Sequence, residues 1–97
     1  MTLLVRPEAS HDILEAARWY EARREGLGTE FVDTINATFE HIVAKPIRFT
    51  RTYRGLRRAL VQRFPYAVYF DEAGPHMIIL AVVHQRRDFK ILDERLG

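Results

Sequence analysis

Basic side chains gather at two places in the sequence, and their types suit chemistry on a phosphate group. One group, His84, Arg86 and Arg87, follows directly after the most apolar segment of the chain. The other group lies within residues 45–63, which contain no acidic residue, and comprises Arg48, Arg51, Arg54, Arg57, Arg58 and Arg63. Because the planar guanidinium group binds phosphate or carboxylate through two parallel hydrogen bonds, both groups suit an anionic partner.

Cleavage of RNA by its own 2′-hydroxyl is one reaction that such residues could support. It requires a base, a cation that stabilises the phosphorane and an acid for the leaving oxygen. Arginine suits the second role, and His84 is the only candidate base beside Arg86 and Arg87, with Asp88 next in sequence. The two arginines could instead contact a partner protein, or simply keep the end of a strand in water.

The sequence does not support a metal centre or a serine-based catalytic site. The four histidines, His11, His41, His76 and His84, lack the spacing of a zinc site, and the chain has no cysteine. Ser10 is the only serine and lies near an expected helix start, where capping is the more common role. We therefore expect no metal ion and no other cofactor.

Length and composition predict one cytoplasmic domain over residues 1–97. The 97 residues, 47% of them hydrophobic, suffice for one core but not for two. The lack of cysteine fits a reducing compartment, and we find neither a signal-peptide pattern nor an apolar run of the ~20 residues that cross a membrane. Acidic residues predominate in 1–44 and basic ones in 45–97. This asymmetry indicates an acidic partner, either nucleic acid or protein, or only a solvated basic surface.

Apolar periodicity predicts the elements that position these residues. Helical spacing over 8–25 and 29–44, with Thr29 as the expected N-cap and a glycine turn between, predicts a helical hairpin. Strands are expected over 2–6, 56–62, 66–71 and 76–84, and short connections favour an antiparallel meander of the last three. The last strand is apolar on both faces, so we expect it to lie inside the sheet.

The resulting fold class is α+β, with the order β-α-α-β-β-β. The helical hairpin should pack on a mainly antiparallel four-stranded sheet, and the tail allows a short C-terminal helix. The expected core comprises Val5, Ile13, Ala17, Tyr20, Phe31, Ile35, Phe39, Ile42, Leu60, Val68, Phe70, Ile79, Ala81 and Val83.

Four stretches in this order resemble the RelE/ParE superfamily of bacterial type II toxin–antitoxin toxins, and most closely its ParE branch. They are RPEASHDILEAARWYE at 6–21, GTEFVDTINATFEHIVAKP at 28–46, RRALVQRFPYAVYFD at 57–71 and ILAVVHQRRD at 79–88. The resemblance covers nearly the whole chain and implies the same β-α-α-β-β-β fold. It also implies a toxin that is neutralised by a ParD-like antitoxin with a flexible C-terminal segment.

The resemblance leaves two targets open. ParE-type members trap DNA gyrase in a DNA-cleaved state, whereas RelE-type members cut mRNA in the ribosome with lysines, arginines and a tyrosine near the C-terminus. The only lysines here are Lys45 and Lys90, and no tyrosine follows Val83. This departure favours gyrase, with a ribosome-dependent endoribonuclease as the alternative.

Each reading assigns roles to particular residues. As a gyrase inhibitor the chain has no catalytic residue, and the expected target-binding residues are Arg57, Arg58, His84, Arg86 and Arg87. As an endoribonuclease it would use His84, Arg86 and Arg87 as its catalytic site. The antitoxin is expected to contact Trp19, Val32, Val43 and Arg63, although Trp19 also suits packing at the edge of the core. We expect no membrane contact and no sequence-specific binding of nucleic acid.

Overall fold

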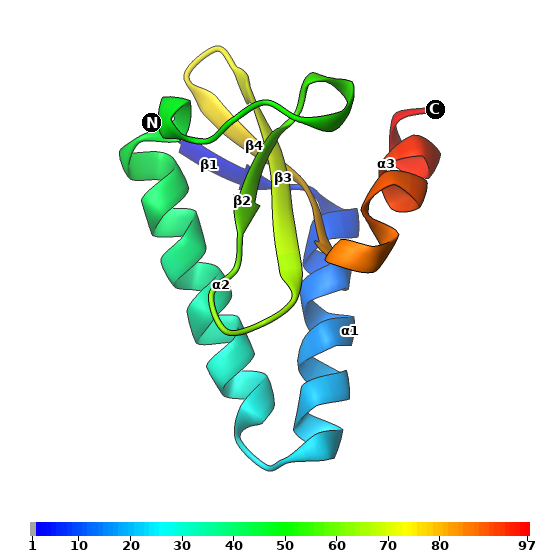
Figure 1. Cartoon of the computed structure of the whole chain (residues 1–97). Coiled ribbons are helices and arrows are strands. Elements are labelled where there is room, and N and C mark those ends of the chain that lie inside the picture. The colour runs from blue at the N-terminus through cyan, green and yellow to red at the C-terminus, as the bar shows by residue number, and fades with distance from the viewer. Residues whose placement is uncertain (1) are drawn as a thin grey trace.

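The computed structural model describes residues 2–97 and has the α+β order expected from the sequence (Figure 1). The elements are β1 (Thr2–Val5), α1 (Pro7–Arg23), α2 (Leu27–Ala44), β2 (Arg57–Leu60), β3 (Tyr66–Ala73), β4 (His76–His84) and α3 (Asp88–Leu96). Short 3₁₀ turns lie at Pro46–Arg48, Tyr53–Gly55 and Gln85–Arg87. Within the described residues, no helix is both long and apolar enough to cross a bilayer.

The four strands form one mixed sheet in the order β1-β4-β3-β2 (Figure 1). β4 is antiparallel to β3, which is antiparallel to β2, and the meander predicted from short connections is confirmed. β1 adds to the other side of β4 as a parallel neighbour, with Val5 opposite Ile79. β4 therefore lies inside the sheet, as the apolar residues on both of its faces predicted.

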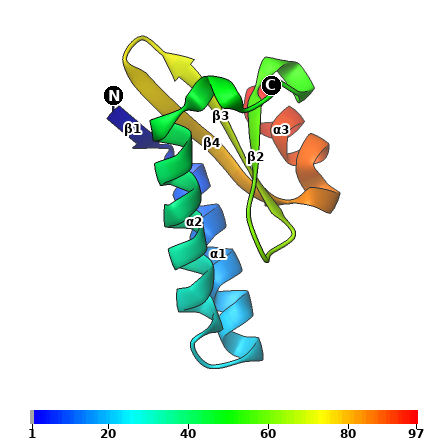
Figure 2. The same ribbon diagram turned by 60° about the vertical axis from the view of Figure 1, so that its left-hand side comes forward.

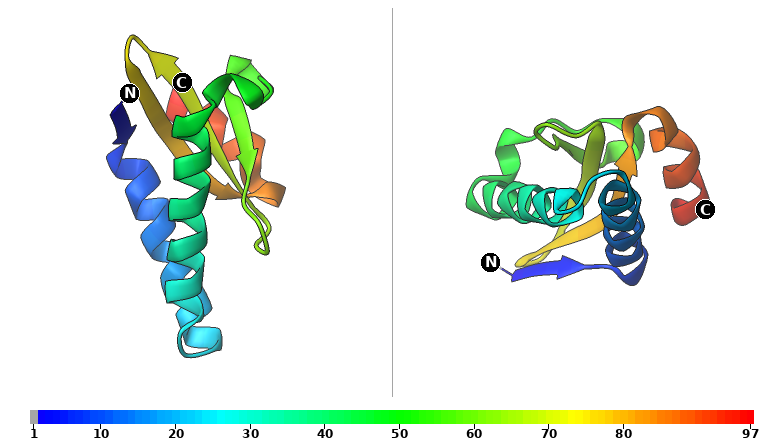
Figure 3. Two further views of the ribbon diagram at one scale, coloured as in Figure 1. Left: turned by 90° about the vertical axis from the view of Figure 1, so that its left-hand side faces the viewer. Right: turned by 90° about the horizontal axis from the view of Figure 1, so that it is seen from below.

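The helical hairpin covers one face of the sheet, with α1 and α2 antiparallel and side by side (Figure 3). Phe31, Ile35 and Ile42 of α2 are fully buried against Val68, Phe70 and Ile79. Tyr20 of α1 joins this core through Phe31, whose ring centroid lies 5.3 Å away. The apolar stripes recognised in the sequence are thus the surfaces that hold the hairpin on the sheet.

The turn between the two helices depends on one carboxylate. Glu21 accepts hydrogen bonds from the backbone N–H groups of Gly26 and Gly28, both at 2.9 Å. Because these donors are satisfied from α1, α2 begins at Leu27 and the expected N-cap at Thr29 is wrong. Gly28 lies so close to α1 that a Cβ atom there would come within 2.6 Å of the carbonyl oxygen of Ala17.

α3 lies on the opposite side of the sheet from the helical hairpin (Figure 2). A second, smaller core lies beneath it. It contains Tyr69, Ala81 and Val83 from the sheet and Leu92 from α3. The C-terminal helix that the tail allowed is therefore present, and it buries the second apolar face of β4. Two expected core residues, Ala81 and Val83, belong to this second cluster and not to the one beneath the hairpin.

Charged side chains fix α3 in place. Arg95 donates to both carboxylate oxygens of Asp12 on α1, at 2.5 and 2.6 Å, and to the carbonyl oxygen of Leu80 at 3.1 Å. The Asp12 carboxylate raises the pKa of Arg95. The Asp12 carboxylate also accepts a hydrogen bond from the backbone N–H of Val82 at 3.0 Å. At this point β4 extends beyond the end of β1. One carboxylate therefore joins α1, β4 and α3.

The expected core is confirmed except at one position. Val5, Ile13, Ala17 and Tyr20 are partly buried at its margin. Leu60 is 58% exposed and its assignment to the core is wrong. It ends β2, the edge strand, and therefore lacks the neighbouring strand that helps to bury its partner Ala67.

Candidate functional site

A polar pocket lies where β4 ends and α3 begins, on the α3 face of the sheet. Arg58 of β2 and Tyr69 of β3 are paired across the sheet and both reach it. The complete lining is Thr52, Arg58, Tyr69, Gln85, Arg86, Arg87, Asp88, Phe89 and Lys90. We call it the α3 pocket. It unites one arginine of the 45–63 group with both arginines that follow β4.

The interior of the pocket is a fixed polar triad. The buried carboxylate of Asp88 accepts a hydrogen bond from the Tyr69 hydroxyl at 2.6 Å and from the Arg58 guanidinium at 2.8 Å. Burial, followed by the hydrogen bond to Asp88, raises the pKa of Tyr69 to about 12. Both bonds go to Oδ2 of Asp88, so its carboxylate is paired with the Arg58 guanidinium inside the protein, whereas Oδ1 is buried without a hydrogen-bond partner in the described part of the chain.

Tyrosine ionisation provides a test of this arrangement. The pKa of Tyr69 lies above its ordinary value of 10.0, so the bond to Asp88 stabilises the fold fully below pH 10 and is lost as the pH rises towards 12. We expect the free energy of unfolding, measured by urea denaturation, to fall between pH 10 and 12. The fall should be smaller in Tyr69→Phe by an amount on the order of 1 kcal/mol. An equal fall in both proteins would contradict the assignment.

The rim of the pocket is cationic and open to solvent. Arg86, Arg87 and Lys90 are exposed, and across residues 2–97 their side chains form no hydrogen bond or ion pair. Phe89 is 57% exposed and stacks on Tyr53, with ring centroids 4.3 Å apart. The sequence did not identify Phe89 or Lys90 as site residues. Phe89 looks in the sequence like an ordinary apolar residue of the C-terminal tail.

His84 lies beside the pocket but does not line it. Its Nδ1 atom accepts the backbone N–H of Arg86 at 3.1 Å and so caps the 3₁₀ turn Gln85–Arg87. Its ring meets Tyr66 edge-on, with centroids 5.5 Å apart. The imidazole therefore orients the backbone that carries Arg86, and the ring nitrogen that a base would use is already occupied.

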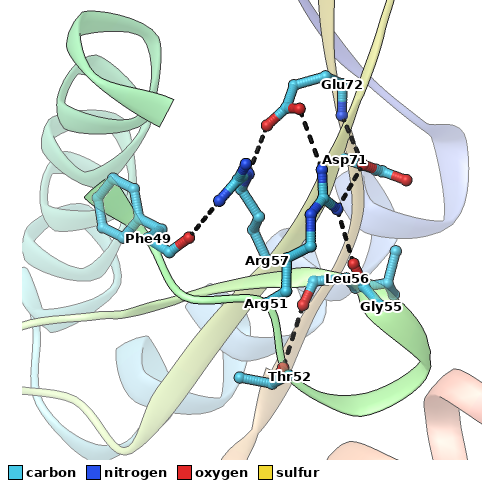
Figure 4. Close-up of polar contacts among 8 residues, drawn as sticks. All are labelled: Phe49, Arg51, Thr52, Gly55, Leu56, Arg57, Asp71 and Glu72. Atoms are coloured by element: carbon cyan, nitrogen blue, oxygen red, sulfur yellow. Dashed lines mark hydrogen bonds and ion pairs between the residues drawn. The ribbon is translucent and has the colours of Figure 1, made fainter. Parts of the chain in front are cut away.

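Arg57 points to the other face of the sheet, because successive side chains of a strand alternate. It pairs with Glu72 and donates to the carbonyl oxygen of Phe49 at 2.7 Å (Figure 4). Arg51 donates to Asp71, to Glu72 and to the carbonyl oxygen of Gly55, at 3.0, 3.1 and 2.7 Å. These bonds tie the loop before β2 to the end of β3, and they keep Arg57 out of the α3 pocket.

Several other arginines are also paired internally. Arg54 binds Asp93 of α3 at 3.2 Å, and Arg63 binds Glu30 of α2 at 2.7 Å. With the pairs of Arg51, Arg57, Arg58 and Arg95 already described, six of the eleven lysines and arginines of residues 45–97 are paired with carboxylates within the fold. The α3 pocket is therefore where unpaired cations gather beside a concave surface.

The residues expected to contact an antitoxin do not share one pocket. Trp19 is 52% exposed on α1, with the Arg23 guanidinium 3.9 Å above its ring. Val32 and Val43 are partly buried on α2, and Arg63 lies in the connection between β2 and β3. A second groove, missed from the sequence, runs between α2 and the edge strand β2. It is lined by Thr34, Ala37, Thr38, His41, Arg48, Phe49, Leu60 and Gln62.

The helical hairpin on a four-stranded sheet is an α+β fold that a protein of known structure shares. A solved structure described as the chromosomal ParDE TA system from P. aeruginosa is similar, with a TM-score of 0.64 over 87% of this chain and 95% of that chain. At 17% sequence identity this likeness shows the fold alone. No curated protein sequence matches. A family model described as the ParE toxin of the type II toxin–antitoxin system parDE matches residues 3–89. The chain therefore belongs to the ParE toxin family, as its sequence resemblance predicted.

Proposed function

We propose that this ParE-family toxin inhibits DNA gyrase and is neutralised by a ParD-like antitoxin. One observation carries the proposal: Arg86 and Arg87 are exposed side by side at the rim of a pocket, and among residues 2–97 their side chains have no partner. The carboxylate in the lining, Asp88, is bound to Arg58. Such an arrangement suits the binding of a partner. Action on gyrase would place the protein in the cytoplasm.

The chemistry of the pocket favours gyrase over mRNA cleavage. A ribonuclease needs groups that give and take protons near neutral pH. Tyr69 is committed to Asp88 and has a pKa of about 12, and Asp88 is buried against Arg58. His84 uses Nδ1 to hold the N–H of Arg86. These three groups support a binding surface and not a proton-transfer site.

The proposed target-binding surface keeps the five residues expected from the sequence but divides their roles. Arg86 and Arg87 contact the target directly, and Arg58 provides the adjoining wall of the pocket. His84 and Arg57 act by holding the backbone nearby, His84 through Arg86 and Arg57 through the loop before β2. Aromatic and arginine side chains in such positions supply most of the energy of protein interfaces.

The antitoxin is proposed to bind the hairpin side of the molecule through a flexible, acidic and apolar segment. Trp19 offers an exposed aromatic surface, and Leu60 and Ile47 are 58% and 79% exposed at and beside the groove between α2 and β2. Val32 and Val43 would extend the apolar contact along α2. Arg63 would exchange its internal partner Glu30 for an acidic residue of the antitoxin. An extended segment can follow such separated sites, because a disordered chain wraps a large surface on binding.

Substitutions at the rim should separate the two possible targets. Arg86→Ala and Arg87→Ala should each weaken toxicity, the double change should weaken it roughly 30-fold or more, and His84→Gln should be milder. The measurement is the induction level needed to stop bacterial growth, with protein amounts matched. Arg18→Ala, an exposed arginine on α1, serves as the control and should leave toxicity unchanged.

The direct assay combines purified toxin with gyrase, plasmid DNA and ATP. We expect linear, protein-linked DNA to accumulate, and addition of the antitoxin before the toxin to prevent it. Loss of toxicity in His84→Gln with the arginine variants intact, together with mRNA cuts in a ribosome assay and no effect on gyrase, would refute the proposal.

A further inference from the structure

The α3 pocket combines three features that ordinary solvation of a strand end does not require. Its rim carries three unpaired cations, Arg86, Arg87 and Lys90. The N-terminus of α3 opens into it, and no side chain caps that helix. An aromatic ring, Phe89, lies beside the cations with more than half of its surface exposed.

We propose that the α3 pocket binds a single-stranded polynucleotide, with phosphates held by Arg86, Arg87 and Lys90 and a base stacked on Phe89. The inference rests on the proposed function and deepens it, because it assigns the pocket to the DNA of the gyrase–DNA complex. Contacts of this kind carry no sequence information, in keeping with the expectation of no sequence-specific binding.

The charge distribution within the pocket favours an anion at the rim. The one carboxylate in the lining, Asp88, is turned inward to Arg58 and Tyr69 at 2.8 and 2.6 Å and is buried. The carboxylate of the lining is therefore already bound, and within residues 2–97 the rim cations remain available to a phosphate. The backbone N–H groups in the first turn of α3 add the positive end of the helix dipole.

The exposed ring of Phe89 favours a single-stranded polynucleotide over other anionic partners. Phe89 is braced from behind by Tyr53, which stacks on it and donates a hydrogen bond to Asp93 at 2.8 Å. A fixed, exposed ring beside cations is the arrangement on which unpaired bases stack, whereas the bases of a duplex are already stacked on one another. An acidic peptide would use the cations but would gain little from the flat face of the ring.

The test measures binding by the toxin alone, without gyrase. Fluorescence anisotropy is recorded with labelled 12-nucleotide oligo(dT), with oligo(U) of the same length and with a duplex of the same length. We expect either single strand to bind more tightly than the duplex. Binding should weaken with salt, with a slope of log K against log[salt] of about −2 for three phosphate contacts. Similar affinity for oligo(dT) and oligo(U) indicates recognition of phosphate and base, and tighter binding of oligo(U) indicates an additional contact to the 2′-hydroxyl.

Variants assign the binding to the pocket. Arg86→Ala/Arg87→Ala should abolish most binding and flatten the salt slope, and Phe89→Ala should weaken binding roughly 10-fold. Phe89→Leu keeps an apolar side chain without a flat ring and should be as weak as Phe89→Ala. Arg48→Ala, which removes an exposed arginine in the other groove, should bind as the parent does. Circular dichroism and thermal unfolding confirm that each variant is folded.

Two results would overturn the inference. One is the absence of binding to either single strand at low salt, and the other is binding that the rim variants and Phe89→Ala leave unchanged. Tighter binding of polyglutamate than of oligo(dT), insensitive to Phe89→Ala, would assign the pocket to an acidic protein instead. Gyrase poisoning without oligonucleotide binding would refute this inference alone. Oligonucleotide binding without any effect on gyrase would instead refute the proposal that gyrase is the target.

Discussion

Replacing Asp12 by alanine should lower the free energy of unfolding by ~3–5 kcal/mol, the usual cost of leaving a mostly buried charge without its partner. The side chains of Arg95 and Asp12 are only 20% and 12% exposed, and the guanidinium donates to both carboxylate oxygens. The variant would also leave the N–H of Val82 without its acceptor. We expect urea denaturation to show the loss, and hydrogen exchange to show that α3 opens more readily than the rest of the fold.

A paired substitution separates the charge effect from general damage. Asp12→Leu combined with Arg95→Met removes both charges and should recover a large part of the loss, because two apolar groups need no ionic partner. Glu15→Ala changes an exposed acid one turn further along α1 and should cost under 1 kcal/mol. A double variant no more stable than Asp12→Ala would contradict the role assigned to the pair.

Gly28→Ala should lower the free energy of unfolding by ~2–3 kcal/mol. An added methyl group would lie 2.6 Å from the carbonyl oxygen of Ala17 and 3.1 Å from the Cβ atom of Glu21, so the two helices would have to separate. The midpoint of thermal unfolding should fall accordingly, although alanine has the higher helix propensity. Separation of the helices would also weaken the hydrogen bonds from Gly26 and Gly28 to the carboxylate of Glu21. The amide hydrogens of the glycine turn should therefore exchange with solvent faster.

Thr29→Ala is the matched control, since Thr29 is the exposed next residue of the same helix. It should change the free energy of unfolding by no more than about 0.5 kcal/mol. Equal stability of Gly28→Ala and the parent protein would mean that the hairpin accommodates a wider spacing than the one described.

The hairpin and the meander were predictable because local patterns encode them. The helical spacing of Phe31, Ile35 and Ile42 reports a single buried face, and the turn Gly74-Pro75 marks the hairpin between β3 and β4. The parallel pairing of β1 with β4 was not predictable, since it joins residues at opposite ends of the sequence. The clustering of Leu92 with Tyr69 beneath α3 was missed for the same reason.

The site was only partly predictable, because one residue of register decides which face an arginine reaches. Arg57 and Arg58 are adjacent and chemically identical, yet Arg58 lies opposite Tyr69 in the α3 pocket and Arg57 lies opposite Phe70 on the hairpin face. The sequence alone could not show which of the two arginines faces which side of the sheet. Nor could it show that the Asp88 carboxylate would pair with Arg58, because the fold brings together two residues that are far apart in the sequence.

The parallel pairing of Thr2–Val5 with His76–Ile79 also affects how the protein emerges from the ribosome. β1 is made first, but its only strand neighbour is made last, so the sheet cannot close during most of translation. The long sequence separation favours slower folding than local contacts would allow. Arg86 and Arg87 lie between β4 and α3, so they are made only after every strand of the sheet. If gyrase is the target, as proposed, the target-binding surface would form only after the segment that follows β4 has been made.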